Sequence, residues 1–125
     1  MRRIIILITA LIAVITLTGT VFIGTAKAER HLGYFTASWC HYCKQTTPIV
    51  NKLKREGTPI TVMDVDSEAY KEAARYYNIK VYPSFVIVNV DDNSGVVTEV
   101  TRRQGAMSEP QMRAWLTRHG VQPSK

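Results

Sequence analysis

Cys40 and Cys43 are the only cysteines of this 125-residue sequence, and their type and spacing could support covalent chemistry. Two residues separate them in the motif Trp39-Cys40-His41-Tyr42-Cys43-Lys44. A disulfide that stabilises an exported domain more often joins distant segments, because closing a longer loop removes more entropy from the unfolded chain. Reactivity therefore explains this closely spaced pair better than stabilisation does.

The position of the pair assigns different roles to the two sulfur atoms. An expected strand ends just before Cys40, and an expected helix begins just after it. Free N–H groups and the dipole at a helix start stabilise an anion, so we expect the pKa of Cys40 to fall below the free value of about 8.5. Cys43 is one turn further in and better shielded. We therefore expect Cys40 to be the nucleophile that forms a mixed disulfide and Cys43 to resolve it, with no other cofactor.

Three other uses of the cysteines compete with this one. A zinc site would need His41 together with His31 or His119, but His41 lies between the cysteines, and no second C-x-x-C or H-x-x-x-H pair completes four ligands. We expect no metal. A c-type haem site needs a histidine directly after the second cysteine, where Lys44 stands. An inert buried pair stays open as an alternative, although Trp39 and Lys44 favour a partly open site.

The elements that position the pair follow from hydrophobic periodicity and turn residues. We expect strands over residues 31–37, 60–65, 84–90 and 96–102. We expect helices over residues 41–55 and 68–77 and a last helix that opens at residue 108. The order β-α-β-α-β-β-α predicts an α/β fold with a parallel crossover, a final hairpin and helices on both faces of the sheet.

Local signals set the ends and faces of these helices. Gly57, Asn78 and Gly120 are expected to end them, and Ser108 to Gln111 form a capping-box pattern. The buried side of the last helix is expected to carry Met112, Trp115 and Leu116. The buried side of the middle helix is expected to carry Ala69, Ala73 and Tyr76 or Tyr77.

Four features in register resemble the thioredoxin family. W-C-x-x-C-K follows a strand, Pro48 lies in the next helix, V-Y-P-S-F spans residues 81–85, and Gly105 precedes the last helix. The similarity covers about residues 31–119. It implies a minimal thioredoxin-like fold with a four-stranded mixed sheet.

The resemblance also implies a substrate groove. The family's cis proline is carried onto Pro83, where it would lie against the active-site disulfide. The backbone of Tyr82 would then face Cys40 and pair with an extended substrate segment, and Gly105 would lie near the same groove. Trp39 would shield one side of the disulfide, and its alternative is a core aromatic position.

Two positions near the cysteines depart from the family. Tyr34 stands where the family's cytoplasmic members carry a buried Asp, and no nearby acid clearly substitutes. His41 and Tyr42 replace the usual Gly-Pro. His41 and Lys44 place positive charge near Cys40, which would favour its thiolate and make the disulfide a stronger oxidant; the alternative is an exposed, largely neutral His41.

Residues 1–28 form a separate segment with the features of an export signal. A basic start at Arg2 and Arg3, an uncharged stretch over residues 4–23 and a small-x-small site ending at Ala28 predict a signal peptide cleaved there. The alternative is an uncleaved membrane anchor, because twenty residues can span the roughly 30 Å core of a bilayer. Either way, residues 29–125 form one domain outside the cytoplasm.

The sequence therefore predicts an extracytoplasmic thiol–disulfide oxidoreductase that acts on protein thiols and disulfides, periplasmic or secreted or held at the inner membrane. It is expected to be monomeric and to need an unidentified redox partner. Removing residues 1–28 lowers the net charge from +6 to +3, because Arg2, Arg3 and Lys27 leave with it, and the scattered basic residues do not indicate nucleic-acid binding. The alternatives are a non-catalytic binding module with the same fold and a zinc-binding protein.

Overall fold

The protein is described by a computed structural model that covers residues 29–124. Seven elements follow one another in the predicted order. They are β1 (Glu29–Thr36), α2 (His41–Arg55), β2 (Ile60–Asp64), α3 (Glu68–Tyr76), β3 (Ser84–Val90), β4 (Val97–Gln104) and α4 (Glu109–Arg118). The predicted signal peptide or anchor lies outside the described residues. Within residues 29–124, no helix is both long and apolar enough to cross a membrane.

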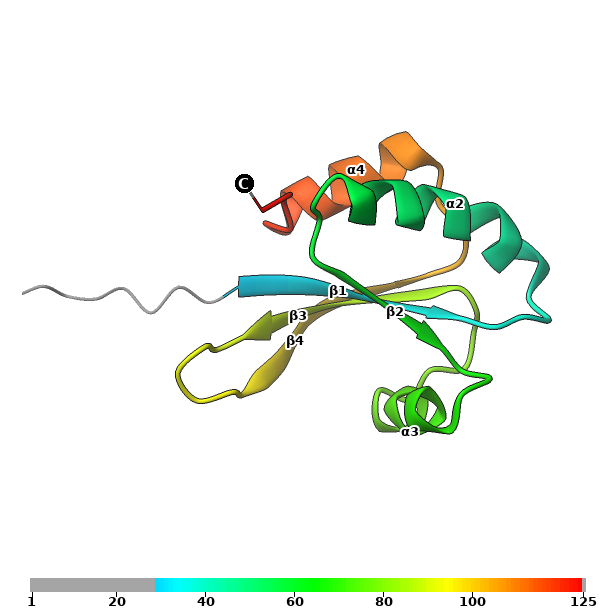
Figure 1. Cartoon of the computed structure of the whole chain (residues 1–125), viewed down its shortest axis with the longest axis horizontal. Helices are drawn as coiled ribbons and strands as arrows, with labels where there is room; N and C mark the ends of the chain where they lie inside the picture. The colour runs from blue at the N-terminus through cyan, green and yellow to red at the C-terminus, as the bar shows by residue number, and fades with distance from the viewer. Residues whose placement is uncertain (1–28, 125) are drawn as a thin grey trace, which may run out of the picture.

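The four strands form one mixed sheet in the order β2-β1-β3-β4. β1 and β2 run parallel, with Leu32 opposite Ile60, whereas β3 is antiparallel to both β1 and β4. Helices α2 and α4 cover one face and α3 covers the other (Figure 1). The parallel crossover brings the carboxyl ends of β1 and β2 to the same edge, where α2 begins. The predicted α/β fold with helices on both faces is confirmed.

The helix ends follow the expected sequence signals. Gly57 has a φ of +96° just beyond α2, in the left-handed region that favours glycine. Asn78 has a φ of 53° after α3, as expected for a left-handed cap. The Ser108 side chain accepts a hydrogen bond from the backbone N–H of Gln111, whose own side chain accepts one from the Ser108 N–H, so the predicted capping box is present.

Two hydrophobic clusters pack on the sheet. The larger cluster joins the sheet to α2 and α4, and its members include Leu32, Leu53, Phe85, Met112 and Trp115. The smaller cluster contains both cysteines and reaches to α3. Its buried members are Phe35, Ala37, Cys40, Cys43, Val65, Ala74, Ile79 and Val86. Both cysteines therefore belong to the smaller of the two clusters.

The expected buried side of α3 is partly wrong. Ala69 and Tyr76 are exposed, whereas Ala74 is buried and Ala73 and Tyr77 are partly buried. Tyr77 turns inward because its ring packs edge-on against Phe35 with centroids 6.0 Å apart. Adjacent tyrosines in a short helix do not reveal from sequence which one faces the sheet.

Candidate active site

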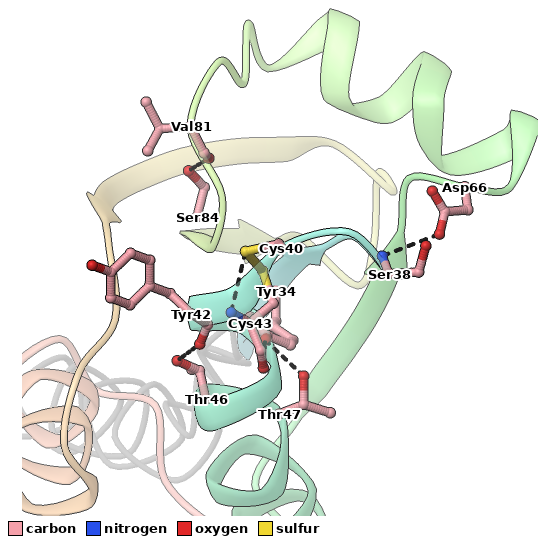
Figure 2. Close-up of a disulfide and its surroundings, with 10 residues drawn as sticks. All are labelled: Tyr34, Ser38, Cys40, Tyr42, Cys43, Thr46, Thr47, Asp66, Val81 and Ser84. Carbon is pink, nitrogen blue, oxygen red and sulfur yellow. Dashed lines mark hydrogen bonds between the residues drawn. A yellow bond between two sulfur atoms is a disulfide. The ribbon is translucent and has the colours of Figure 1, made fainter.

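The sulfur atoms of Cys40 and Cys43 form a disulfide at the start of α2, with the two Cα atoms 5.2 Å apart. Cys40 is the N-cap residue in extended backbone conformation, and Cys43 lies in the first turn. The Cys40 Sγ accepts a hydrogen bond from the backbone N–H of Cys43 at 3.1 Å (Figure 2). The N-cap position, which usually carries a hydroxyl or carboxylate acceptor, is here occupied by sulfur.

Both cysteines are buried, and they differ slightly in exposure. Cys40 is 6% exposed and Cys43 only 1%. The first turn of α2 carries no acidic residue, whereas its last turn carries three basic residues. The helix start is thus free of negative side chains that would oppose an anion at the Cys40 sulfur.

The loop before β3 forms one side of the site. The peptide bond between Tyr82 and Pro83 is cis, as the resemblance implied, and the segment between Val81 and Ser84 passes beside the disulfide (Figure 2). The Gly105 N–H donates to the Pro83 carbonyl at 2.8 Å, which brings the end of β4 to this loop. Gly105 has a φ of +87° with open space around it, so conformation rather than crowding requires glycine there.

Exposed aromatic rings flank the disulfide. Trp39 is 69% exposed, so its alternative placement in the core is wrong. Its ring packs edge-on against Tyr82, with centroids 5.5 Å apart. Tyr42 is 61% exposed within the C-x-x-C motif. Val81, which the sequence reasoning did not single out, adds a further exposed apolar side chain next to Tyr82.

His41 and Lys44 are both exposed on α2. The His41 Nε2 atom lies 3.4 Å from the Gln45 side-chain nitrogen, and its ring packs edge-on against Tyr42. Neither His41 nor Lys44 forms an ion pair within the described residues. This exposure matches the alternative expectation for His41, although its effect on the Cys40 thiolate stays a prediction.

Tyr34, the residue at the family's acidic position, lies fully buried behind the pair. Its hydroxyl is 2.9 Å from the Thr47 hydroxyl and donates to the Cys43 carbonyl at 3.4 Å. Tyr34 thus supports the first turn of α2 through neutral hydrogen bonds. It supplies no carboxylate beside Cys43.

A cleft of about 690 Å³ opens on the Cys43 side of the disulfide. Cys43, Thr47 and Asp64 line this Cys43 cleft together with Lys44 and others. Asp64 was missed by the sequence reasoning, although it ends β2 directly opposite Thr36 of the parallel strand β1. Because parallel strands end at the same edge, that register is the signal that could have placed it near the cysteines.

A second cleft, of about 440 Å³, opens on the Trp39 side and is here called the Lys80 cleft. Trp39 and Tyr82 form its wall toward the disulfide, and Lys71, Arg75 and Lys80 bring positive charge to it. Asp66 is its only carboxylate. Hydrogen bonds from Ser38, first from its side chain and then from its backbone N–H, hold the pKa of Asp66 below its usual value.

The histidines that a zinc site would need are not brought to the cysteines. His31 lies near the start of β1 beside Glu29, and His119 caps the end of α4 against Trp115. Residues 29–124 contain no group of three or more His, Cys, Asp or Glu side chains arranged to hold a metal ion.

A four-stranded mixed sheet with a disulfide at the start of its first crossover helix and a cis proline beside it defines the thioredoxin-like class of proteins. The family model described as Thioredoxin matches residues 13–118. The chain belongs to the thioredoxin family.

Individual relatives agree with this assignment. The chain is 39% identical over 54 residues to a Thioredoxin H-type from Fagopyrum esculentum, covering 43% of this chain and 47% of that protein. It is 36% identical over 83 residues to a Protein disulfide-isomerase from Ricinus communis, covering 61% and 17%. The chain thus spans about half or less of the length of these curated relatives.

Solved structures match over more of their length. The crystal structure of Fasciola hepatica thioredoxin is similar with a TM-score of 0.60 and 32% identity, covering 75% of this chain and 84% of that one. A thioredoxin from Thermus thermophilus gives a TM-score of 0.58 and 26% identity, covering 73% of each chain.

Proposed function

We propose that this chain is a thiol–disulfide oxidoreductase that exchanges disulfides with protein substrates outside the cytoplasm. The observation that carries this proposal is the Cys40–Cys43 disulfide at the start of α2, with the more exposed sulfur at the N-cap. The relatives named thioredoxin and protein disulfide-isomerase support redox chemistry of this kind. The cysteine pair itself carries the two electrons, so the proposal includes no further cofactor.

In the reducing direction, the Cys40 thiolate attacks one sulfur of a substrate disulfide. A bond forms between Cys40 and that sulfur, and the other substrate sulfur leaves as a thiolate that takes up a proton. Cys43 then loses its proton and attacks the Cys40 Sγ, which releases the second substrate thiol. The protein ends oxidised by two electrons and the substrate ends reduced by two.

The geometry supports this division of labour. The Cys43 N–H points at the Cys40 Sγ, so a negative charge at Cys40 gains a hydrogen bond and the field of the helix start. Cys43 is shielded from an incoming protein but lines the Cys43 cleft, through which its proton can reach solvent. The reverse direction uses the same steps in the opposite order.

A location outside the cytoplasm is proposed from the pattern of residues 1–28. A basic start, an uncharged stretch and a small-residue site ending at Ala28 are typical of export signals. In that compartment a separate redox partner would have to reset the pair after each turnover. The reduction potential of Cys40–Cys43, measured against glutathione, would decide whether the chain acts as reductant or oxidant.

The test compares the full chain with Cys40→Ser and Cys43→Ser in a protein-disulfide reduction assay driven by dithiothreitol. We expect Cys40→Ser to fall to the uncatalysed rate. We expect Cys43→Ser, reduced and then freed of dithiothreitol, to accumulate a mixed disulfide with the substrate through Cys40, visible by mass spectrometry. Equal rates for the wild type and Cys40→Ser would refute the proposal and favour the non-catalytic binding module.

A further inference from the structure

The Lys80 cleft is adjacent to the disulfide site. Its wall consists of Trp39, which directly precedes Cys40, and Tyr82, which directly precedes Pro83. A substrate segment that lies along the Tyr82 backbone to reach Cys40 can continue in one of two directions. One of these directions crosses the cleft. The side chains that line the cleft decide which segments gain by continuing over it.

The floor of the cleft is apolar and its rim is mainly cationic. Val65, Ala74 and Ile79 are buried at its base. The cations are Lys71 and Arg75 of α3 and Lys80 of the segment that follows it. Asp66 is the only carboxylate among the lining side chains. The lining therefore carries an excess of positive charge.

The carboxylates near these cations leave part of that charge unpaired. Lys71 pairs with Glu68 at 2.6 Å and Arg75 pairs with Glu72, but both pairs lie on the exposed surface of α3, where such pairs are weak. Neither Glu68 nor Glu72 lines the cleft. Lys80 forms no ion pair with any other described residue.

We infer that the Lys80 cleft is a substrate subsite that selects polypeptide segments carrying Asp or Glu side chains close to the reacting cysteine. A carboxylate at the rim meets Lys80, which has no competing partner, while an adjacent apolar group covers the floor. The complementary charges also increase the rate of encounter. This inference rests on the proposed function, because the segment is the one that undergoes disulfide exchange.

The test uses three disulfide-bonded peptides with one core sequence, flanked by Glu, by Gln or by Lys. The full chain reduces each peptide in the presence of dithiothreitol, and kcat/KM is measured after subtraction of the uncatalysed rate. We expect the Glu peptide to exceed the Gln peptide by about two- to fivefold, the range of one exposed ion pair, and the Lys peptide to be slowest. The ranking should weaken as salt is raised.

Two variants with the same change of charge distinguish a local effect of the cleft from an effect of the protein's net charge. Lys80→Glu should remove the preference for the Glu peptide and favour the Lys peptide. Lys54→Glu is the matched control, because Lys54 is exposed near the far end of α2, about 21 Å along the helix axis from Cys40. It should leave the ranking as in the wild type.

The outcomes distinguish this inference from the proposed function. If the Gln peptide is not reduced, the proposed function fails. If the Gln peptide is reduced but the three peptides react at equal rates, the subsite inference is wrong. It is also wrong if Lys54→Glu changes the ranking as much as Lys80→Glu does, because the preference would then reflect net charge alone.

Discussion

The two faces of the sheet differ in how completely they are closed. On the α2 and α4 face, the cluster around Phe85 and Ile87 has only Ile49 and Val62 as partly buried neighbours. On the other face, the smaller cluster holds both cysteines and borders on partly buried side chains such as Tyr77 and Tyr82. The α2 and α4 face is thus the more completely covered of the two, and both cysteines lie in the cluster with more partly buried neighbours.

The ion pairs of the helices also differ between the two faces of the sheet. Lys52 of α2 pairs with Glu109 of α4 at 2.8 Å, and Arg113 of α4 pairs with Glu56 at 2.8 Å. The ion pairs of α3 are instead internal to that helix. Helices α2 and α4 are therefore linked by partly exposed ion pairs, which are individually weak, whereas the ion pairs of α3 link it to no other helix.

The largest effect is expected from truncating one buried isoleucine side chain on each face of the sheet. Ile87 is fully buried in the larger cluster, whereas Ile79 is 8% exposed and lines the Lys80 cleft. Replacing a buried Ile by Ala costs about 2–5 kcal/mol, and the cost rises with the cavity that remains. We expect Ile87→Ala near the upper end and Ile79→Ala near the lower end, measured by urea denaturation. Equal losses would contradict the difference between the faces.

A smaller effect is expected from the serines that begin α4 and α3. Ser108 makes its capping hydrogen bond, whereas Ser67, the N-cap of α3, makes none with its side chain. Ser108→Ala should lower the free energy of unfolding by about 1 kcal/mol. Ser67→Ala is the matched control and should change it by much less. A loss at Ser67 as large as that at Ser108 would show that the two helix starts are equally dependent on their caps.

The smallest effect on stability is expected from the ion pair between Lys52 of α2 and Glu109 of α4. The Lys52 ammonium, by its hydrogen bond and charge, holds the pKa of Glu109 below its usual value of 4.5. Because the folded-state pKa is lowered, the stabilisation is present above about pH 4.5 and is lost as the pH falls through the depressed pKa. The stability difference between the wild type and Glu109→Gln should therefore shrink in acid.

Denaturation at pH 7 and at pH 3 measures that change. Glu72→Gln, which alters an exposed pair internal to α3, is the comparison for the other face. A Glu109→Gln difference that stays constant across this range would mean that the carboxylate contributes no charge-dependent stability.

Most of the fold could be predicted because its signals are local. Residues 41–55 and 84–90 were expected as a helix and a strand and are found with those bounds. Apolar periodicity, Gly57 and the Ser108 capping box each act within a few residues. The expectation for α3 failed at Ala69 and left open whether Tyr76 or Tyr77 turns inward, because which side of a short helix faces the sheet depends on partners such as Phe35, distant in the chain.

The features of the candidate site also fall into two groups, those set by local sequence and those set by packing between distant elements. The sequence by itself determined the two cysteines and their place at a helix start, and through its resemblance to a family it also indicated Pro83, directly before the β-prone residues 84–90, and Gly105, before the last helix. Only the tertiary structure decided that Trp39 is exposed against Tyr82, that Tyr34 bonds to Thr47, and that Lys80 lines a cleft beside the disulfide. Motif chemistry depends on residue type and short spacing, whereas a cleft forms only when separate elements pack together and set the distances between their side chains.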